Sequence, residues 1–165
     1  EALMRAGESA VVVPMDGFHF DDAILNTRGH SARKGAPHTY DVSGFEVLLK
    51  RIKAREADIA IPVFDRSLEL ARAAAEIIST EAKFILVEGN YLLLDQEPWS
   101  RLKPYFDFTI FLNLPEAELE QRLIARWLGF GFDEADAHEK ALGNDIPNAR
   151  LVLKFSAKAD LTISN

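Results

Sequence analysis

Two apolar runs that each end in an acidic residue and a glycine constrain the fold of this chain more than any other feature. The first run, 10–15, leads into Asp16-Gly17, and the second, 84–87, leads into Glu88-Gly89. Both resemble buried parallel strands, which are apolar and rich in β-branched residues. Because α/β sheets bind ligands at the carboxyl ends of their strands, both acids are predicted to lie at one edge of a sheet. Ordinary core strands followed by turns would give the same pattern.

Strand-like and helix-like segments alternate along the rest of the chain. Further strands are expected at residues 59–64, 108–114 and 161–163, and helices at 43–55, 99–105, 115–126, 134–141 and 149–157. Residues 68–78 fit a helix, or else a turn followed by an edge strand at residues 76–80. The alternation predicts one α/β domain with a largely parallel sheet. We expect the strands ending at Pro14, Glu88 and Leu114 to lie parallel in that one sheet.

The charge balance argues against several kinds of partner. The chain has 26 acidic residues against 19 Lys and Arg, a net charge of −7, which disfavours broad binding to nucleic acid or an anionic membrane. The lack of cysteine excludes thiol chemistry and, with no signal peptide, fits a cytoplasmic protein. No apolar run reaches the roughly 20 residues that span a bilayer. Any site for a polyanion must therefore be a local cluster of basic residues.

Five motifs occur in an order that resembles a known family. They are Val13-Pro14-Met15-Asp16-Gly17-Phe18-His19, Arg33-Lys34-Gly35-Ala36-Pro37-His38-Thr39-Tyr40-Asp41, Pro62-Val63-Phe64-Asp65-Arg66, Val87-Glu88-Gly89-Asn90-Tyr91-Leu92-Leu93-Leu94 and Asn144-Asp145-Ile146-Pro147-Asn148-Ala149-Arg150. Over nearly its whole length the chain resembles the P-loop kinases of the uridine kinase, pantothenate kinase and phosphoribulokinase group, above all the bacterial fructose transport system kinases. The resemblance implies a three-layer P-loop NTPase-type fold, a lid around residues 127–147, and ATP and Mg²⁺ as cofactors. A homodimer is compatible with it.

The phosphate-binding loop of that family, G-x-x-x-x-G-K-[ST], does not occur in the 165 residues. In the family this loop precedes a helix whose last turns match Glu1 to Ala6, closed by Gly7. We therefore expect the sequence to lack its first strand and phosphate loop, and these residues alone to bind ATP weakly and be inactive. The alternative is a relative that lost ATP binding.

Four residues are the candidates for catalysis. A substrate alcohol needs a carboxylate to accept its proton, and Asp16, which matches the family's catalytic aspartate, suits this role. Glu88 matches an acidic position that would hold Mg²⁺, a cation that prefers oxygen ligands. Arg122 and Arg126 share one helix face and match lid arginines that bind phosphates. The structural alternatives are a turn cap for Asp16, a buried acid for Glu88, and a pairing of Arg122 with Glu118.

The resemblance also implies substrate and nucleotide contacts. Arg33 and Lys34 form a local basic spot that suits an anionic substrate or phosphates, although a solvated loop would also explain them. The segments around the acceptor contribute His19, Arg33, Lys34, Tyr40, Asp65, Arg66, Asn90 and Tyr91. The base side of the nucleotide is matched by Asn148 and Arg150.

The motifs together predict ATP-dependent phosphoryl transfer to an alcohol group of a small molecule. The expected acceptor is a sugar such as fructose or a pantothenate-like compound. A uridine-type nucleoside kinase and a non-catalytic P-loop-like binding module are the alternatives. An intact phosphate loop upstream would favour a kinase, and a degenerate one the binding module.

Overall fold

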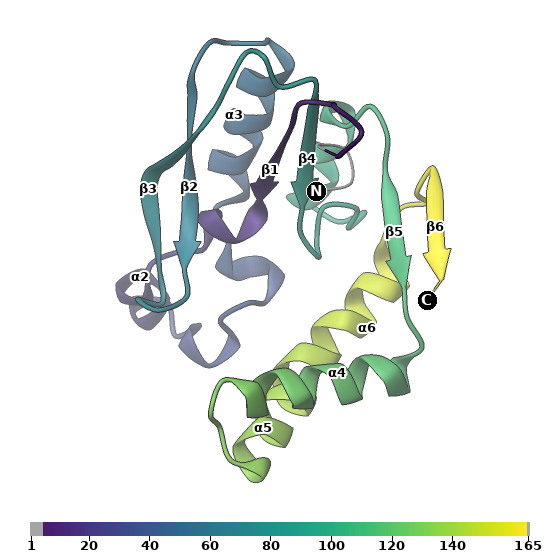
Figure 1. The fold of residues 1–165 in the computed structure, drawn as a ribbon. Coiled ribbons are helices and arrows are strands. Elements are labelled where there is room, and N and C mark those ends of the chain that lie inside the picture. The colour runs from purple at the N-terminus through teal and green to yellow at the C-terminus, as the bar shows by residue number, and fades with distance from the viewer. Residues whose placement is uncertain (1–4, 165) are drawn as a thin grey trace.

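The computed structural model describes residues 5–164 (Figure 1). Most of the helix end expected at residues 1–6 lies outside these residues. The strands are β1 (Ala10–Pro14), β2 (Ile59–Asp65), β3 (Leu70–Ile78), β4 (Phe84–Glu88), β5 (Ile110–Asn113) and β6 (Leu161–Ser164). The α-helices are α2 (Asp22–Thr27), α3 (Val42–Lys53), α4 (Glu116–Gly129), α5 (Glu134–Lys140) and α6 (Ile146–Phe155). Short 3₁₀ helices occupy Met15–Phe18, Ser31–Arg33, Pro37–Thr39 and Trp99–Tyr105, and a π-helix spans Ala141–Asp145.

The parallel pairing of β1 with β4 places the two acids as the sequence predicts. Val13 lies opposite Val87, and Pro14 lies opposite Glu88. Asp16 follows Pro14 by two residues, so both acids stand at the carboxyl edge of this pair. The prediction that they share one sheet edge is confirmed, and so is the α/β fold with mainly parallel strands.

The expectation that the third strand joins the same sheet is wrong within the described residues. There β5 pairs only with β6, in parallel, and no ladder links this pair to β1 and β4. A ladder requires neighbouring strands roughly 4.8 Å apart. Figure 1 shows β4 and β5 as separate ribbons with no described strand between them.

Residues 70–78 form β3, within a segment that the sequence left open between a helix and an edge strand at 76–80. This strand pairs antiparallel with β2, with a register shift between Ile61 and Val63. Its alanines favour a helix when taken alone, but cross-strand pairing decides strand formation more than intrinsic preference does. The hairpin turn at its start carries Arg66 toward the carboxyl end of β1.

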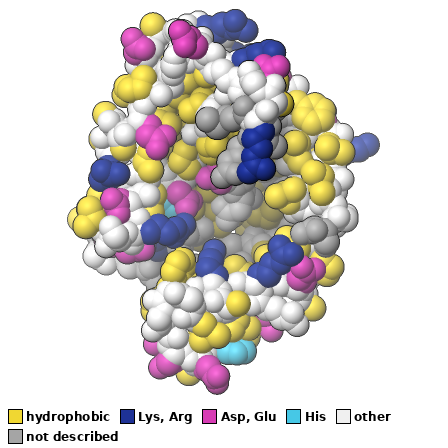
Figure 2. Space-filling model, in the orientation of Figure 1, with side chains coloured by type: hydrophobic (Ala, Val, Ile, Leu, Met, Phe, Trp, Pro, Cys, Tyr) yellow, Lys and Arg dark blue, Asp and Glu magenta, His cyan; other side chains and the backbone are white. Residues whose placement is uncertain are grey.

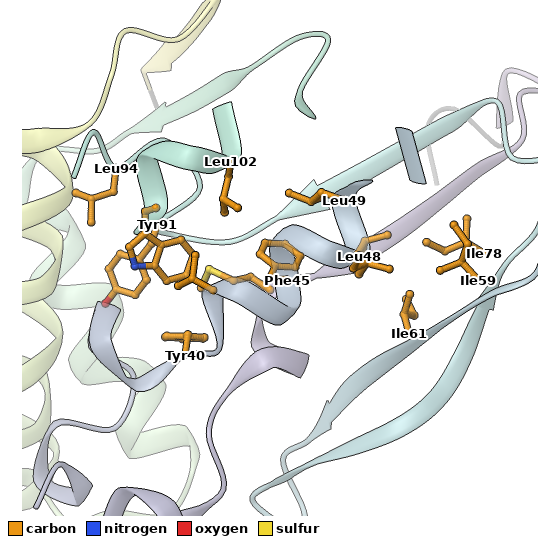
Figure 3. Packing of buried hydrophobic residues seen from close by; sticks show 14 residues of the cluster. Tyr40, Phe45, Leu48, Leu49, Ile59, Ile61, Ile78, Tyr91, Leu94 and Leu102 are labelled. Atoms are coloured by element: carbon orange, nitrogen blue, oxygen red, sulfur yellow. The ribbon is translucent and has the colours of Figure 1, made fainter. Parts of the chain in front are cut away.

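The main core packs α3 between the hairpin and the β1–β4 pair (Figure 3). Asp41 caps this helix by accepting a hydrogen bond from the Gly44 amide at 2.9 Å. Buried members of the cluster include Phe45, Leu48, Leu49, Ile59, Ile61 and Ile78. A second group of aromatic rings, Tyr40, Tyr91 and Trp99, extends this core below the end of β1. Within residues 5–164, no helix combines the length and apolarity that crossing a membrane requires.

Gly17 brings the backbone after Asp16 into close contact with β2. A Cβ atom at this position would stand 2.3 Å from the Pro62 carbonyl oxygen, closer than any real contact allows. We expect Gly17→Ala to lower the free energy of unfolding by about 1–3 kcal/mol, the usual cost of overpacking. Urea unfolding measures this loss.

Gly129→Ala is the matched control, because a Cβ at Gly129 meets no atom within 4 Å. Its effect should stay within about 0.5 kcal/mol or favour the helix. Equal stabilities for the two variants would mean that the backbone at Gly17 moves freely away from β2.

Candidate active site

Three elements that are far apart in the sequence meet at the Asp16 carboxylate. Arg66 from the β2–β3 turn donates from Nη2 to Oδ2 at 2.8 Å. Tyr40 donates from its hydroxyl to Oδ1 at 3.4 Å. Burial and the Asp16 charge hold the pKa of Tyr40 far above its ordinary value, so the phenol keeps its proton and remains a donor. Asp16 thus has two positioned donors while a third of its side chain faces solvent.

Glu88 contributes a second carboxylate to this edge of the sheet. Packing around the group and the neighbouring Asp16 raise the pKa of Glu88, and Arg66 opposes this rise. Among residues 5–164, no residue donates a hydrogen bond to the Glu88 carboxylate or forms an ion pair with it. Glu88 therefore has an unpaired carboxylate beside a second carboxylate, and Mg²⁺ prefers oxygen ligands of this kind.

These two acids would not enclose a cation by themselves. Among residues 5–164, no group of three or more His, Cys, Asp or Glu side chains is placed to hold a metal ion. Mg²⁺ typically binds through one or two carboxylates and completes its shell with water and substrate phosphates. The donor set is therefore compatible with Mg²⁺ that arrives with a nucleotide.

His19 packs beneath this site as a neutral imidazole. Its Nδ1 donates to the Asp16 carbonyl oxygen at 2.9 Å, and its ring lies 4.0 Å from the Tyr40 ring and 5.1 Å from the Phe64 ring. Burial lowers the pKa of His19 below 6.5, against the opposing influence of Asp16. His19 therefore supports the backbone that presents Asp16.

The lowered pKa of His19 predicts a pH dependence of stability. The unfolded chain takes up a proton near pH 6.5 more readily than the folded one, so stability should fall as the pH drops below about 6.5. His19→Gln should lose less stability between about pH 7 and pH 5 than the unmodified protein does. Thermal unfolding across that range measures the difference. The control is His138→Gln, which changes an exposed histidine of α5 and should leave the pH profile unaltered.

Among the other residues predicted to contact the acceptor, some lie at the edge of the site and others have structural roles. Lys34 lies over the Phe64 ring and pairs with Asp22 at 2.8 Å. Asp65 closes the hairpin turn, accepting from the Ser67 hydroxyl at 2.6 Å and pairing with Arg72 at 3.2 Å. Asn90 is exposed in the turn after β4. In the space-filling view, Lys and Arg side chains border the hollowed middle of this face (Figure 2).

Arg33 ties the acceptor loop to the helices that follow α4. It donates from Nη1 to the Gly143 carbonyl at 3.0 Å and from Nη2 to Asn148 Oδ1 at 2.9 Å. The Asn144 amide donates to the Lys34 carbonyl at 2.9 Å, which adds a third hydrogen bond. Asn148, expected on the nucleotide side, is thus buried against Arg33. Nearby, the Tyr91 hydroxyl donates to the Gly35 carbonyl at 2.6 Å.

The remaining predicted arginines form ion pairs on α4 and α6. Arg122 pairs with Glu118 at 2.5 Å, which is the structural alternative that the sequence suggested. Arg126 pairs with Asp145 at 2.8 Å. Arg150 joins α6 to α4 through Glu116 at 2.7 Å. For Arg122, Arg126 or Arg150 to bind phosphate, the arginine must exchange its carboxylate partner for phosphate oxygens.

Asp145 and Trp127 were not among the residues predicted for the site. Asp145 accepts from Arg126 and from the Trp127 indole at 2.7 Å, and so fixes α4 against the π-helix. These partners lie 18 and 19 residues away, beyond the reach of helical spacing. The only sequence signal was the position of Asp145 in the last of the five motifs.

Comparison with known proteins gives relatives that cover most of the chain. The uncharacterized protein YggC of Escherichia coli (strain K12) is 34% identical over 151 residues, 92% of this chain and 62% of YggC. A structure from Silicibacter sp. TM1040, provisionally described as a fructose transport system kinase, is 42% identical. It has a TM-score of 0.93 and covers 98% of this chain and 78% of its own.

A more distant structure matches the same fold. YFH7 of Saccharomyces cerevisiae, provisionally described as a P-loop kinase with a circular permutation, is 26% identical with a TM-score of 0.83. The match covers 94% of this chain and 58% of that one, so the present chain spans less than two thirds of YggC and of YFH7. No family model matches the chain.

Proposed function

The chain belongs to the P-loop kinases, and from this premise we propose that the protein transfers the terminal phosphoryl group of ATP to an alcohol of a small molecule. The observation that carries the proposal is the Asp16 carboxylate, which stands at the end of β1 beside Glu88 and is fixed by Arg66 and Tyr40. A carboxylate that is positioned at the exposed edge of a parallel sheet can accept the proton of a hydroxyl group.

In the proposed reaction, the oxygen of the acceptor alcohol attacks the γ-phosphorus of ATP, and Asp16 accepts the proton of that alcohol. The bond from that phosphorus to the bridging oxygen breaks, and ADP leaves. Tyr40 keeps the carboxylate oriented, and the acceptor hydroxyl takes up the exposed side of Asp16. Glu88 would hold Mg²⁺, which supplies charge neutralisation of the phosphates when bound. A cytoplasmic location is part of this proposal.

The acceptor and lid side of the site is also a proposal. Arg66 and Lys34 line the rim beside Asp16 and favour an acceptor that carries negative charge. The region around residues 127–147 would act as the lid, with Arg122 and Arg126 exchanging their carboxylate partners for phosphate oxygens. Asn148 and Arg150 would then stand on the nucleotide side.

Turnover with a panel of acceptors tests the proposal. In a form of the protein extended upstream to include the phosphate loop, ADP formation from Mg-ATP is followed with fructose, pantothenate or uridine present, and the phosphorylated product is identified by mass spectrometry. We expect turnover with fructose or pantothenate to exceed turnover with uridine. Preference for uridine would instead establish a nucleoside kinase. Binding of ATP without any transfer would favour a non-catalytic module.

A further inference from the structure

A cavity of about 460 Å³ lies beside the candidate active site, between residues 33–42, the segment 94–99 and α6. Its volume falls in the range of small-molecule sites. Its walls include Leu94, Trp99 and Leu151, which come from three separate parts of the chain. Figure 3 shows Leu94 at the end of the core that faces the pale yellow helix α6.

This cavity is separate from the two catalytic carboxylates. Neither Asp16 nor Glu88 lines it, so a hydroxyl group held inside it would not be presented to the proposed base. Tyr40 is the shared residue, because its side chain lines the cavity and its hydroxyl bonds Asp16. A molecule bound here would therefore be an additional ligand and not the acceptor of the reaction.

The polar end of the cavity carries a positive charge that is not ion-paired with any carboxylate of residues 5–164. Arg33 lines the cavity, and its two hydrogen-bond partners, the Gly143 carbonyl and Asn148 Oδ1, are both neutral. No described carboxylate forms an ion pair with Arg33. The one acid in the lining, Glu97, is already paired with Arg101 at 3.3 Å.

His38 lies at the same end as Arg33. Partial burial, His30 and Arg33 lower the pKa of His38, which agrees with an excess of positive charge around it. One uncompensated guanidinium suits one negative charge, and a planar carboxylate matches its geometry. Apart from Gln96, Glu97 and Asn148, the rest of the wall is apolar or aromatic, as small-ligand sites predominantly are.

We propose that this cavity binds a small monocarboxylate with an apolar, ring-sized body. The carboxylate would accept hydrogen bonds from Arg33 while the ring packs between Trp99 and Leu151. Arg33 joins the acceptor loop to Gly143 and Asn148, and such a ligand gives Arg33 a further hydrogen-bond partner. Its binding would stabilise the arrangement in which the loop and α6 are joined. Binding is measured without turnover, so the outcome is independent of the proposed kinase activity.

Benzoate, benzyl alcohol and benzylamine serve as probes of similar size with negative, neutral and positive charge. The chain has two tryptophans, and the indole N–H resonance of each is followed by NMR during titration. We expect benzoate to shift the Trp99 resonance saturably and to bind about tenfold more tightly than benzyl alcohol, since hydrogen bonds to charged groups are strong. Benzylamine should leave Trp99 unchanged. Trp127, which lies on α4 and does not line the cavity, is the internal control.

Two variants separate the charge from the space. Arg33→Met keeps the aliphatic stem but removes the charge, so benzoate should lose its advantage over benzyl alcohol. Leu151→Phe keeps Arg33 and reduces the free volume, so benzoate and benzyl alcohol should both bind more weakly. Arg28→Met, outside the cavity lining, is the matched charge control and should bind benzoate normally. A Trp99 resonance unmoved by benzoate up to its solubility limit overturns the proposal. So does equal binding of benzoate and benzylamine, or a benzoate preference that persists in Arg33→Met.

Discussion

Asp16→Asn is expected to lower the turnover number by roughly 10²–10⁴-fold, the usual contribution of a general base, in a form of the protein extended upstream to include the phosphate loop. The amide has nearly the same shape as the carboxylate and can still accept the Arg66 hydrogen bond, but it cannot take the proton of an alcohol. The substitution leaves every backbone contact of the site unchanged. ATP affinity should therefore change little, and steady-state kinetics together with calorimetric titration of nucleotide would separate the two effects.

Asp136→Asn makes the same chemical change at an exposed carboxylate of α5 and should leave turnover unaffected. If Asp16→Asn turned over at nearly the unmodified rate, Asp16 would be reduced to a turn residue held by Arg66. A loss of ATP binding in this variant, with normal stability, would instead assign Asp16 to the nucleotide side.

The two strands that carry the acids could be predicted because their signal is local. An apolar run of about five residues that stops at an acid and a glycine predicts both the position of a strand and the residue at which it ends. Their parallel pairing follows, because a connection long enough for a crossover joins them. The hairpin at residues 59–78 lacked such a signal, since alanines in its second strand fit a helix until β2 provides a partner.

The contacts of the site side chains could not be predicted in the same way. Arg66 reaches Asp16 across 50 residues of sequence, and Arg33 reaches Asn148 across 115. Motif order grouped these residues around one predicted site, but it did not pair them with one another. Asn148 illustrates the limit, because its position matched a nucleotide contact while its side chain is buried against Arg33. Long-range hydrogen bonds and ion pairs depend on how whole elements pack, and no spacing rule encodes them.

The aromatic cluster beneath Asp16 gives the largest expected effect on stability. Trp99 is 1% exposed, and its ring centre lies 5.3 Å from that of Tyr91 and 5.7 Å from that of Tyr40. Its indole also donates to the Pro37 carbonyl at 3.2 Å. Trp99→Ala should therefore cost about 3–5 kcal/mol, a large share of a typical total of about 5–15 kcal/mol.

Trp127→Ala is the matched comparison, because Trp127 is only partly buried and packs against Phe130 and Phe132 at the end of α4. It should cost less, about 1–2 kcal/mol, when both variants are unfolded in urea and followed by circular dichroism. Equal losses would mean that the packing at the end of α4 contributes as much to cooperative folding as the core around α3. A much larger loss for Trp99→Ala would instead show that the packing that positions Tyr40, and through it Asp16, is also what holds the fold together.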